Sequence, residues 1–239
     1  MIKQARKYHK WLMAFIGIQF LFWSITGLYM VSLDIHYIHG EPLQKQASHG
    51  LQLKDVSFSI NSLLSRYPDA KNIEVARFMD KQVYRFSSVD NQKVMVDAFS
   101  GEQLPIVNEL LARAIARNNY VGTEKVASVR LISNIAEKPS ELSPRHLPVW
   151  QVTFDHFASP TFYISQQSGV IVTKRHNFWR LFDWMWRFHI MDYDDGENVA
   201  NWFLFVVSIL GGVAALAGAV LTYFRVVKRQ VKEQVDAAI

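Results

Sequence analysis

Two long runs of uncharged, mostly apolar residues constrain this chain more than any other feature. The first covers residues 11–33 and the second residues 199–224, and neither contains Asp, Glu, Lys or Arg. Because a helix rises about 1.5 Å per residue, each run can cross a hydrocarbon core of roughly 30 Å. The first run is longer than the apolar core of a signal peptide, and no small-residue cleavage pattern follows it. We therefore expect two retained transmembrane helices in a lipid bilayer.

Basic residues beside the two runs predict how the chain crosses a membrane. Lys and Arg precede the first run and follow the second, at Lys3, Arg6, Lys7, Lys10, Arg225, Lys228, Arg229 and Lys232. By the positive-inside rule both termini are cytoplasmic, and everything between the runs lies on the other side. In a bacterium, this predicts a multi-pass inner-membrane protein whose main domain is periplasmic.

Composition excludes several classes of function. The net charge is +5, but many basic residues lie beside the apolar runs and the middle has no Lys/Arg-rich block, so we expect no nucleic-acid partner. The chain has no cysteine, which excludes disulfides, c-type haem attachment, cysteine-ligated iron–sulfur clusters and thiol catalysis. Nucleotide-binding glycine motifs and hydrolase motifs are also absent from the sequence. We therefore expect no domain for a flavin or a nicotinamide cofactor.

The polar middle of the chain predicts an α+β fold with an internal repeat. Residues 94–101 alternate like a strand and end in Ser-Gly, and residues 162–169 do the same. Each block has an earlier strand and an amphipathic helix: strands at 82–87 and 150–154, helices at 59–66 and 106–117. We therefore expect a unit of one helix and three strands, present twice, with residues 133–148 as a loop.

Residues 177–198 lie between this middle and the second apolar run. If they form a helix, Trp179, Phe182, Trp186 and His189 share one face. An acidic turn follows directly. A single histidine on an aromatic face is either a packing residue or a ligand, and the segment alone leaves both open.

Small residues form stripes along both apolar runs. They are Gly17, Ser24 and Gly27 in the first run, and Gly211, Ala214, Ala215, Gly218 and Thr222 in the second. Such stripes allow two helices to pack closely, and they would also admit a flat macrocycle. The two interpretations are compatible, because a ligand between helices also needs room.

Several of these features together resemble a known family. They are the repeated helix-plus-strands unit, His9-Lys-Trp-Leu-Met with Thr26-Gly27 later in the same run, and the segment LFDWMWRFH at 181–189. This order of parts resembles the PepSY-associated transmembrane proteins and covers nearly the whole chain. The resemblance implies a haem-b inner-membrane protein that reduces ferric iron or ferric siderophores. The chain differs in having two apolar runs where larger members have four or more, and in having Trp186 where a first histidine would stand.

Given that resemblance, histidines are the candidate axial ligands of haem b. His189 and the pair His36 and His39 are expected on the same side of the membrane, so His189 could share a haem with either. The alternative role for these histidines is interfacial anchoring. His9 has no second cytoplasmic histidine, so a ligand role there requires His9 from two chains in a homodimer. The remaining histidines are expected at the surface: His49, His146, His156 and His176.

The acidic turn after His189 also has two interpretations. Its residues are Asp192, Asp194, Asp195 and Glu197. Carboxylates at the start of a helix accept from free N–H groups and stabilise the helix dipole. Alternatively, they form a docking site for Fe³⁺, a hard cation that prefers oxygen ligands.

The sequence therefore predicts an α+β membrane protein in which two transmembrane helices flank a periplasmic domain of two PepSY-like repeats. The expected parts are cytoplasmic tails (1–10 and 225–239), a first helix with an outer extension (11–39), the repeats (52–104 and 105–176), an interfacial aromatic helix with the acidic turn (177–198) and a second helix (199–224). The expected function is a haem-b ferric reductase that passes electrons from quinol or a partner to free or chelated periplasmic Fe³⁺. The alternative is a non-enzymatic binding module that regulates a peptidase or accompanies a transporter.

Overall fold

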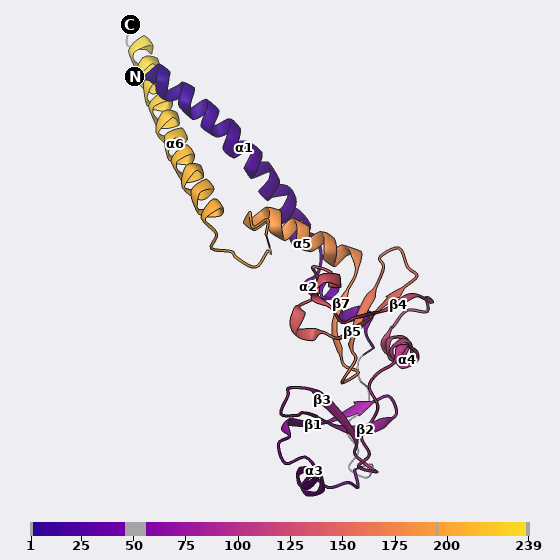
Figure 1. Cartoon of the computed structure of the whole chain (residues 1–239). Helices are drawn as coiled ribbons and strands as arrows, with labels where there is room; N and C mark the ends of the chain where they lie inside the picture. The colour runs from indigo at the N-terminus through magenta and orange to yellow at the C-terminus, as the bar shows by residue number, and fades with distance from the viewer. Residues whose placement is uncertain (1, 46–55, 195, 238–239) are drawn as a thin grey trace. The chain divides into compact units, whose positions relative to one another are not determined.

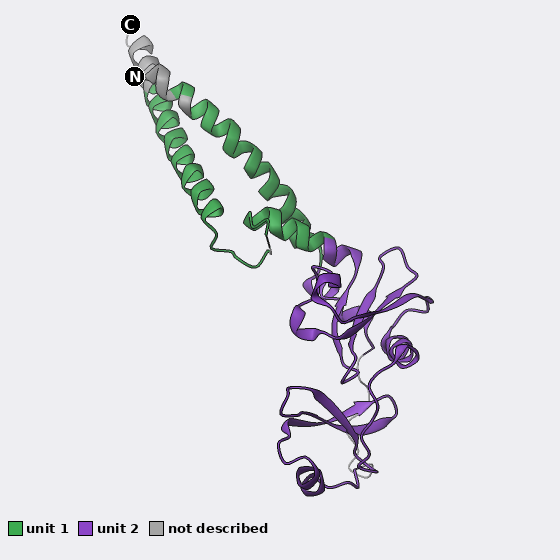
Figure 2. Cartoon of the chain, viewed as in Figure 1, with its two compact units in different colours: residues 1–33, 181–239 green, residues 34–180 purple. Residues whose placement is uncertain are grey.

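The computed structural model describes residues 2–45, 56–194 and 196–237. The chain divides into two compact units (Figure 2). Unit 1 is Met1–Leu33 with Leu181–Ile239, and unit 2 is Asp34–Arg180. The α+β class is confirmed, because long apolar helices near both ends of the chain flank a middle that contains two small antiparallel sheets.

Unit 1 contains the two apolar helices, α1 (Ile2–Ser32) and α6 (Trp202–Ala237) (Figure 1). Within them, His9–Ser32 and Trp202–Val227 are long and apolar enough to cross a membrane, as the sequence predicts. A small core around Ile16 and Val207 joins the two helices, and most of their other large apolar side chains stay exposed. Exposed apolar surface of this extent needs an apolar environment or a partner to cover it.

The outer extension of the first helix is a separate short element. Helix α1 ends at Ser32, and α2 (Ile35–Ile38) follows after a break. The carboxylate of Asp34 accepts hydrogen bonds from the backbone N–H groups of His36 and Tyr37, which is a typical N-cap arrangement. A 3₁₀ turn, η1 (Glu41–Leu43), comes next.

Unit 2 contains the two repeats. The first repeat is α3 (Ile60–Arg66), β1 (Lys71–Phe78), β2 (Lys81–Ser87) and β3 (Lys93–Asp97). The second repeat is α4 (Glu109–Asn119), β4 (Val126–Ile132), β5 (Val149–Phe154), β6 (Thr161–Ser165) and β7 (Ile171–Arg175). Each sheet is a meander in chain order, β1-β2-β3 and β4-β5-β6-β7. The predicted helix and three strands are present twice, and β7 is an additional strand in the second sheet.

The turns after β3 and β6 show the repeat most clearly. In each turn the glycine N–H donates to the carbonyl of the last strand residue, and the distance is 2.9 Å for both Gly101 and Gly169. Asp97 and Ser165, the last strand residues, each donate to the residue after that glycine at 2.8 Å. The glycines have φ angles of 73° and 63°, which residues other than glycine rarely adopt. The Ser-Gly signal in the sequence therefore marks two equivalent turns.

The two repeats share one hydrophobic core. Val83 and Met95 of the first sheet belong to the same buried cluster as Val152 and Phe162 of the second, with α4 packed against it. The stretch predicted as a loop, 133–148, contains two short 3₁₀ turns, η3 (Ile135–Glu137) and η4 (Pro144–His146). Leu142 in this loop is buried, which fixes the loop against the second sheet.

Candidate cofactor-binding histidines

His189 lies at the end of α5 (Asn177–Ile190), where its ring and its backbone both contact α1. The ring Nδ1 is 3.0 Å from the hydroxyl oxygen of Thr26, which is almost fully buried. The indole N–H of Trp23 donates to the carbonyl of His189 at 2.7 Å. Two hydrogen bonds from one helix therefore fix both the position and the orientation of this imidazole.

The hydrogen bonds of Thr26 determine which ring nitrogen of His189 carries the proton. The Thr26 hydroxyl has one proton, and its oxygen lies 2.8 Å from the carbonyl of Phe22, which can only accept. Thr26 therefore donates to Phe22 and accepts from the N–H at Nδ1 of His189. In the neutral imidazole, a proton on Nδ1 leaves the lone pair on Nε2, and Nε2 has no hydrogen-bond partner among the described residues. A neutral imidazole with a free Nε2 lone pair is the form that binds a metal.

Gly27, the neighbour of Thr26, also lies against the ring of His189. A Cβ atom at this position would lie 3.5 Å from Cε1 of the ring, an ordinary van der Waals contact. One residue before the histidine, Phe188 stacks on Phe22 with ring centroids 6.5 Å apart. The Thr-Gly pair of the family resemblance is therefore the contact surface for His189.

His9 lies at the other end of α1, against α6. A Cβ atom at Gly218 would be only 3.2 Å from Cε1 of His9 and 3.5 Å from its Nε2. Nδ1 of His9 is buried without a hydrogen-bond partner among the described residues. His9 and Thr26 are about 26 Å apart along the helix at about 1.5 Å per residue, so the two histidine positions are at opposite ends of the apolar span.

The small-residue stripes are only partly used for contact between the helices. Gly211, Ala214 and Gly218 of α6 are buried or half-buried, and Gly211 and Gly218 face side chains of α1. Gly17 has no atom within 4 Å of a Cβ built on it. Ala215 and Thr222 are exposed in α6, as is Ser24 in α1. Close helix packing is therefore confirmed for part of the α6 stripe, and the outward residues remain open to another contact.

His36 and His39 belong to unit 2, where each has a different neighbour. Nδ1 of His36 is 3.1 Å from a carboxylate oxygen of Glu41, and this hydrogen bond raises the pKa of the exposed imidazole. The ring of His39 packs on the indole of Trp179 with centroids 5.1 Å apart. The pairing of either residue with His189 stays a prediction.

The acidic turn uses its first carboxylate to hold its own backbone. Asp192 is buried and accepts from the N–H groups of Asp194 at 3.3 Å and Asn198 at 2.9 Å. Helix α6 is capped by Asn201, whose side-chain oxygen accepts from the N–H of Leu204. The predicted helix-capping role therefore belongs to Asn201, and Asp192 stabilises the turn.

The iron-docking site expected at this turn stays a prediction. Asp195, one of its four carboxylates, lies outside the described residues, and Glu197 is exposed. Across the described residues, no three His, Asp or Glu side chains come together to hold a metal ion.

His176 is buried, so its predicted surface position is wrong. It is only 2% exposed, and its Nε2 is 2.9 Å and 3.1 Å from the carbonyl oxygens of Tyr37 and Ile38. A carbonyl can only accept, so Nε2 carries the proton and ties α2 to the end of β7. Burial lowers the pKa of this imidazole. His146 and His156 are half-buried, and His49 lies outside the described residues.

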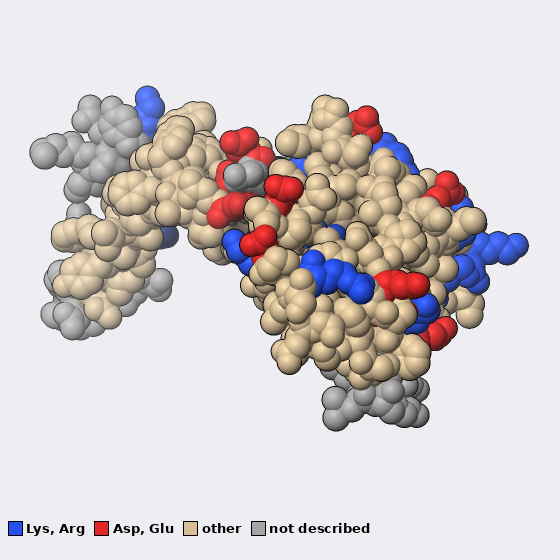
Figure 3. Space-filling model, turned by 60° about the horizontal axis from the view of Figure 1, so that its bottom comes forward, with Lys and Arg blue, Asp and Glu red and all other residues tan. Residues whose placement is uncertain are grey.

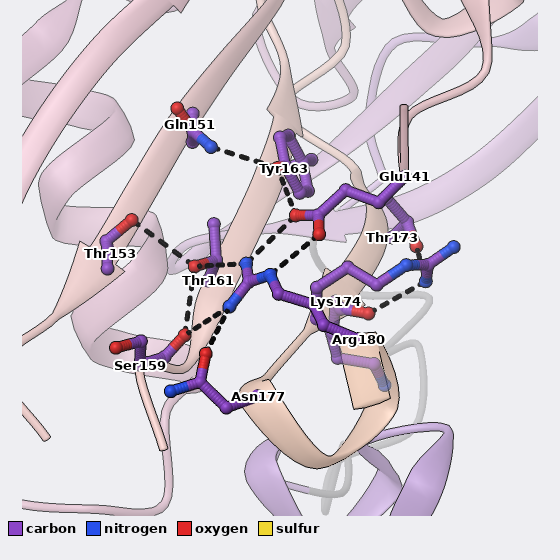
Figure 4. A network of polar contacts seen from close by, with 11 residues as sticks. Glu141, Gln151, Thr153, Ser159, Thr161, Tyr163, Thr173, Lys174, Asn177 and Arg180 are labelled. Atoms are coloured by element: carbon purple, nitrogen blue, oxygen red, sulfur yellow. Dashed lines mark hydrogen bonds and ion pairs between the residues drawn. The ribbon is translucent and has the colours of Figure 1, made fainter. Parts of the chain in front are cut away.

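Unit 2 contains a polar network around Arg180, which is drawn in Figure 4. No pattern in the sequence indicates this network. Arg180 of α5 makes a two-pronged ion pair with Glu141 of the 133–148 loop, at 2.7 and 2.9 Å. The hydroxyl of Tyr163 donates to the same carboxylate at 2.5 Å and accepts from the side-chain amide of Gln151. Arg180 also reaches the hydroxyl oxygen of Thr161. This network attaches the first turn of α5 to the second sheet.

The charges of the network perturb one another. Burial alone would raise the pKa of Glu141, but the hydrogen bonds from Arg180 and Tyr163 outweigh it and lower that pKa. Burial, together with the nearby Glu141 carboxylate, raises the pKa of Tyr163. Glu141 is therefore ionised and Tyr163 neutral near neutral pH, as a structural ion pair requires.

Comparison of the chain with protein-family models, with curated proteins and with solved structures finds no match. The class that the fold defines is an α+β chain in which two helices capable of crossing a membrane flank a two-sheet domain.

Proposed function

We propose that this protein is a haem-b ferric reductase of the bacterial inner membrane. The observation that carries the proposal is the hydrogen bond between Nδ1 of His189 and Thr26, which leaves Nε2 as a free donor to a metal. The resemblance to PepSY-associated transmembrane proteins suggests haem b as the cofactor that this nitrogen would bind. Haem b, when bound, would supply one-electron transfer to Fe³⁺.

The residues around His189 suit a haem ligand. Thr26 holds the tautomer and the orientation of the ring, and Trp23 holds the backbone of the same residue. Phe22 and Phe188 provide apolar surface next to it, which excludes water and lowers the local dielectric. In this proposal His39 or His36 would be the second histidine to hold the haem, and of these two only His36 has a carboxylate partner.

His9 is the ligand of a second proposed haem. Its Nδ1 lacks a partner among the described residues, and the chain offers no other histidine near its cytoplasmic end. The site therefore requires the same residue from a second copy, and a two-fold homodimer supplies it.

The remaining parts of the proposal concern electrons and iron. Both termini are cytoplasmic and unit 2 is periplasmic, following the positive-inside rule. Quinol or a membrane partner donates electrons, and the substrate is free or chelated Fe³⁺. The product Fe²⁺ leaves for a separate importer.

The test is a reduced-minus-oxidised absorption spectrum of the purified full chain in detergent. A b-type haem band that disappears in His189→Ala and persists in His146→Ala would support the proposal. Iron reduction is then followed with a ferrous-specific chelator after addition of a quinol analogue. If the folded wild-type protein lacks this band, the proposal is wrong.

The alternative is a non-enzymatic binding module that regulates a peptidase or accompanies a transporter. Unit 2 favours it, because the two repeats share a core of their own that contains no residue of α1 or α6. In that case His189→Ala leaves the function intact, and a peptidase or transporter copurifies with the wild-type chain.

A further inference from the structure

Arg85 in unit 2 is a buried cation without an adequate partner. Its side chain is only 14% exposed, and its Nε is buried with no hydrogen-bond partner among the described residues. Its nearest carboxylate, Glu74, is 3.9 Å away and largely exposed, so the ion pair is loose. Burial lowers the pKa of Arg85, which reflects the cost of keeping this charge away from water. A buried guanidinium normally has a close carboxylate or phosphate partner.

Arg85 lines a cleft of about 480 Å³ between the first repeat, α4 and the turn after β6. Arg77 and Lys45 line the same cleft, and Asp80 is its one acidic residue. Asp80 already faces Arg77 at 3.9 Å and is itself almost fully exposed. The cleft therefore offers three cations against one carboxylate.

The geometry of the β1–β2 turn holds Arg77 beside this cleft. Its Nε donates to the carbonyl of Met79 at 3.1 Å, and Met79 has a φ angle of 53° in the tight turn. On the face of the molecule drawn in Figure 3, acidic and basic side chains are interspersed. An anion would therefore be attracted by the basic side chains that line the cleft, and not by a broad positive potential over the surface.

A second cavity borders Arg85 from another side, but it suits an anion less well. It measures about 470 Å³ and is lined by the acidic residues Glu74 and Asp90 as well as by basic ones. The first cleft has the clearer excess of positive charge. Its volume suits a small molecule rather than a polypeptide segment.

We propose that the cleft of Arg85, Arg77 and Lys45 binds a small di- or tricarboxylate. One carboxylate would accept both prongs of the buried Arg85 fork, and a second would face Arg77 and Lys45 at the rim. Two-pronged carboxylate binding suits arginine because its N–H groups are planar and fixed in spacing. This site is independent of haem and of the histidines in unit 1.

The experiment is calorimetric titration of the purified full chain in detergent with citrate at low salt. Inorganic phosphate and glycerol are titrated in parallel. Citrate binding that Arg85→Gln weakens about tenfold or more, and Arg77→Gln several-fold, would support the site. Arg113→Gln is the matched control, because Arg113 is an arginine on α4 paired with Glu109 outside the cleft. Glu74→Gln should bind citrate as tightly as wild type or more tightly, since it frees Arg85.

Other results would overturn the proposal. They are absence of citrate binding to the wild-type chain, unchanged binding in a folded Arg85→Gln variant, or equal binding of phosphate through the same arginines. If Arg85→Gln does not fold, Arg77→Gln provides the test, because Arg77 is exposed. The proposal then requires that Arg77→Gln weakens citrate binding and leaves the unfolding temperature unchanged. None of these measurements involves redox activity, so failure here leaves the reductase proposal standing.

Discussion

The two ends of helix α5 each have a histidine with close hydrogen bonds, and the two rings are held in opposite ways. His176, just before the helix, donates from Nε2 to two backbone carbonyls and is fully buried. His189, near the last turn, donates from Nδ1 to Thr26 and keeps Nε2 free. The first arrangement uses the Nε2 proton to join two backbone segments and leaves Nδ1 buried without a hydrogen-bond partner among the described residues, and the second leaves Nε2 as the unpaired nitrogen. Residue type alone does not distinguish a structural histidine from a candidate ligand, but burial does: the unpaired Nδ1 of His176 is enclosed, whereas His189 is only partly buried.

The surroundings of the two ends differ in the same sense. Near His176 the helix is fixed by the ion pair of Arg180 with Glu141, within a densely hydrogen-bonded part of unit 2. Near His189 the contacts are an indole, a threonine hydroxyl and aromatic rings. Changes at the first end should therefore lower stability, and under the reductase proposal changes at the second should alter cofactor binding.

The largest expected effect is that of His189→Ala. Under the reductase proposal it removes a residue that would hold the haem, so bound haem should fall by one equivalent per chain and the corresponding b-type band should be lost. Thermal unfolding of unit 2 should stay unchanged, because His189 belongs to unit 1. Haem content per chain and circular dichroism on the same sample measure both. Full haem content in the folded variant would contradict the ligand assignment.

Glu141→Gln should have the largest effect on the stability of unit 2. It leaves Arg180 half-buried without its carboxylate, which costs about 3 kcal/mol. The wild type should also show a matching pH dependence. The folded-state pKa of Glu141 lies below its ordinary value of 4.5, so its stabilisation is present above that value and is lost as the pH falls through the folded pKa. Denaturant unfolding of the full chain against pH should therefore show an acid-induced loss that Glu141→Gln lacks.

His176→Ala should destabilise unit 2 and leave the haem spectrum intact. The loss of its Nε2 hydrogen bonds and of buried volume costs about 2 kcal/mol. Burial lowers the pKa of His176 in the folded chain below its ordinary value of 6.5. Below pH 6.5 the unfolded chain therefore binds more protons at this residue than the folded chain does, and the stabilisation from His176 decreases as the pH falls. Chemical unfolding at pH 7.5 and at pH 5.5 measures the difference. An altered spectrum with normal stability would reverse the comparison between the two histidines.

Thr26→Val tests the hydrogen bond that orients His189. Valine keeps the shape of threonine but removes the hydroxyl, so Nδ1 of His189 loses its acceptor and the preference for the ligand tautomer. Loss of such a supporting hydrogen bond should weaken haem binding by about tenfold to a hundredfold. Thr26→Ser restores the hydroxyl and should recover most of the affinity, measured by haem titration of the apoprotein. Equal affinity in the valine and serine variants would mean that the hydroxyl has no role in cofactor binding.

The parts of the fold that local patterns encode were predictable from the sequence. The two long runs without charged residues predicted α1 and α6. The alternating strand pattern that ends in Ser-Gly predicted the equivalent turns at Gly101 and Gly169. The break before α2 also had a local signal, since Asp34 is a typical N-cap residue.

Contacts between distant residues were not predictable, because no local pattern records them. Glu141 is in a stretch that reads only as a loop, and its pairing with Arg180 depends on how the second sheet folds. The burial of His176 depends in the same way on carbonyls of α2. For the candidate site, the sequence identified His189 and Thr26 separately, and only the structure reveals the hydrogen bond that joins them and determines the tautomer.

The smallest expected effect concerns His9, the histidine of α1. Gly218 leaves only 3.2 Å between a built Cβ and the ring of His9, whereas a Cβ at Gly212 meets nothing within 4 Å. In either position alanine favours the helix over glycine by up to about 1 kcal/mol. Gly212→Ala should therefore raise the thermal stability of the full chain slightly, and Gly218→Ala should gain less because the imidazole must shift. If the His9 ring packs on α6 as His189 packs on α1, Gly218→Ala should also perturb any haem held at His9, while Gly212→Ala leaves it unchanged. Identical unfolding temperatures and spectra for the two variants would show that His9 makes no constrained contact with α6, and the parallel with His189 would then fail.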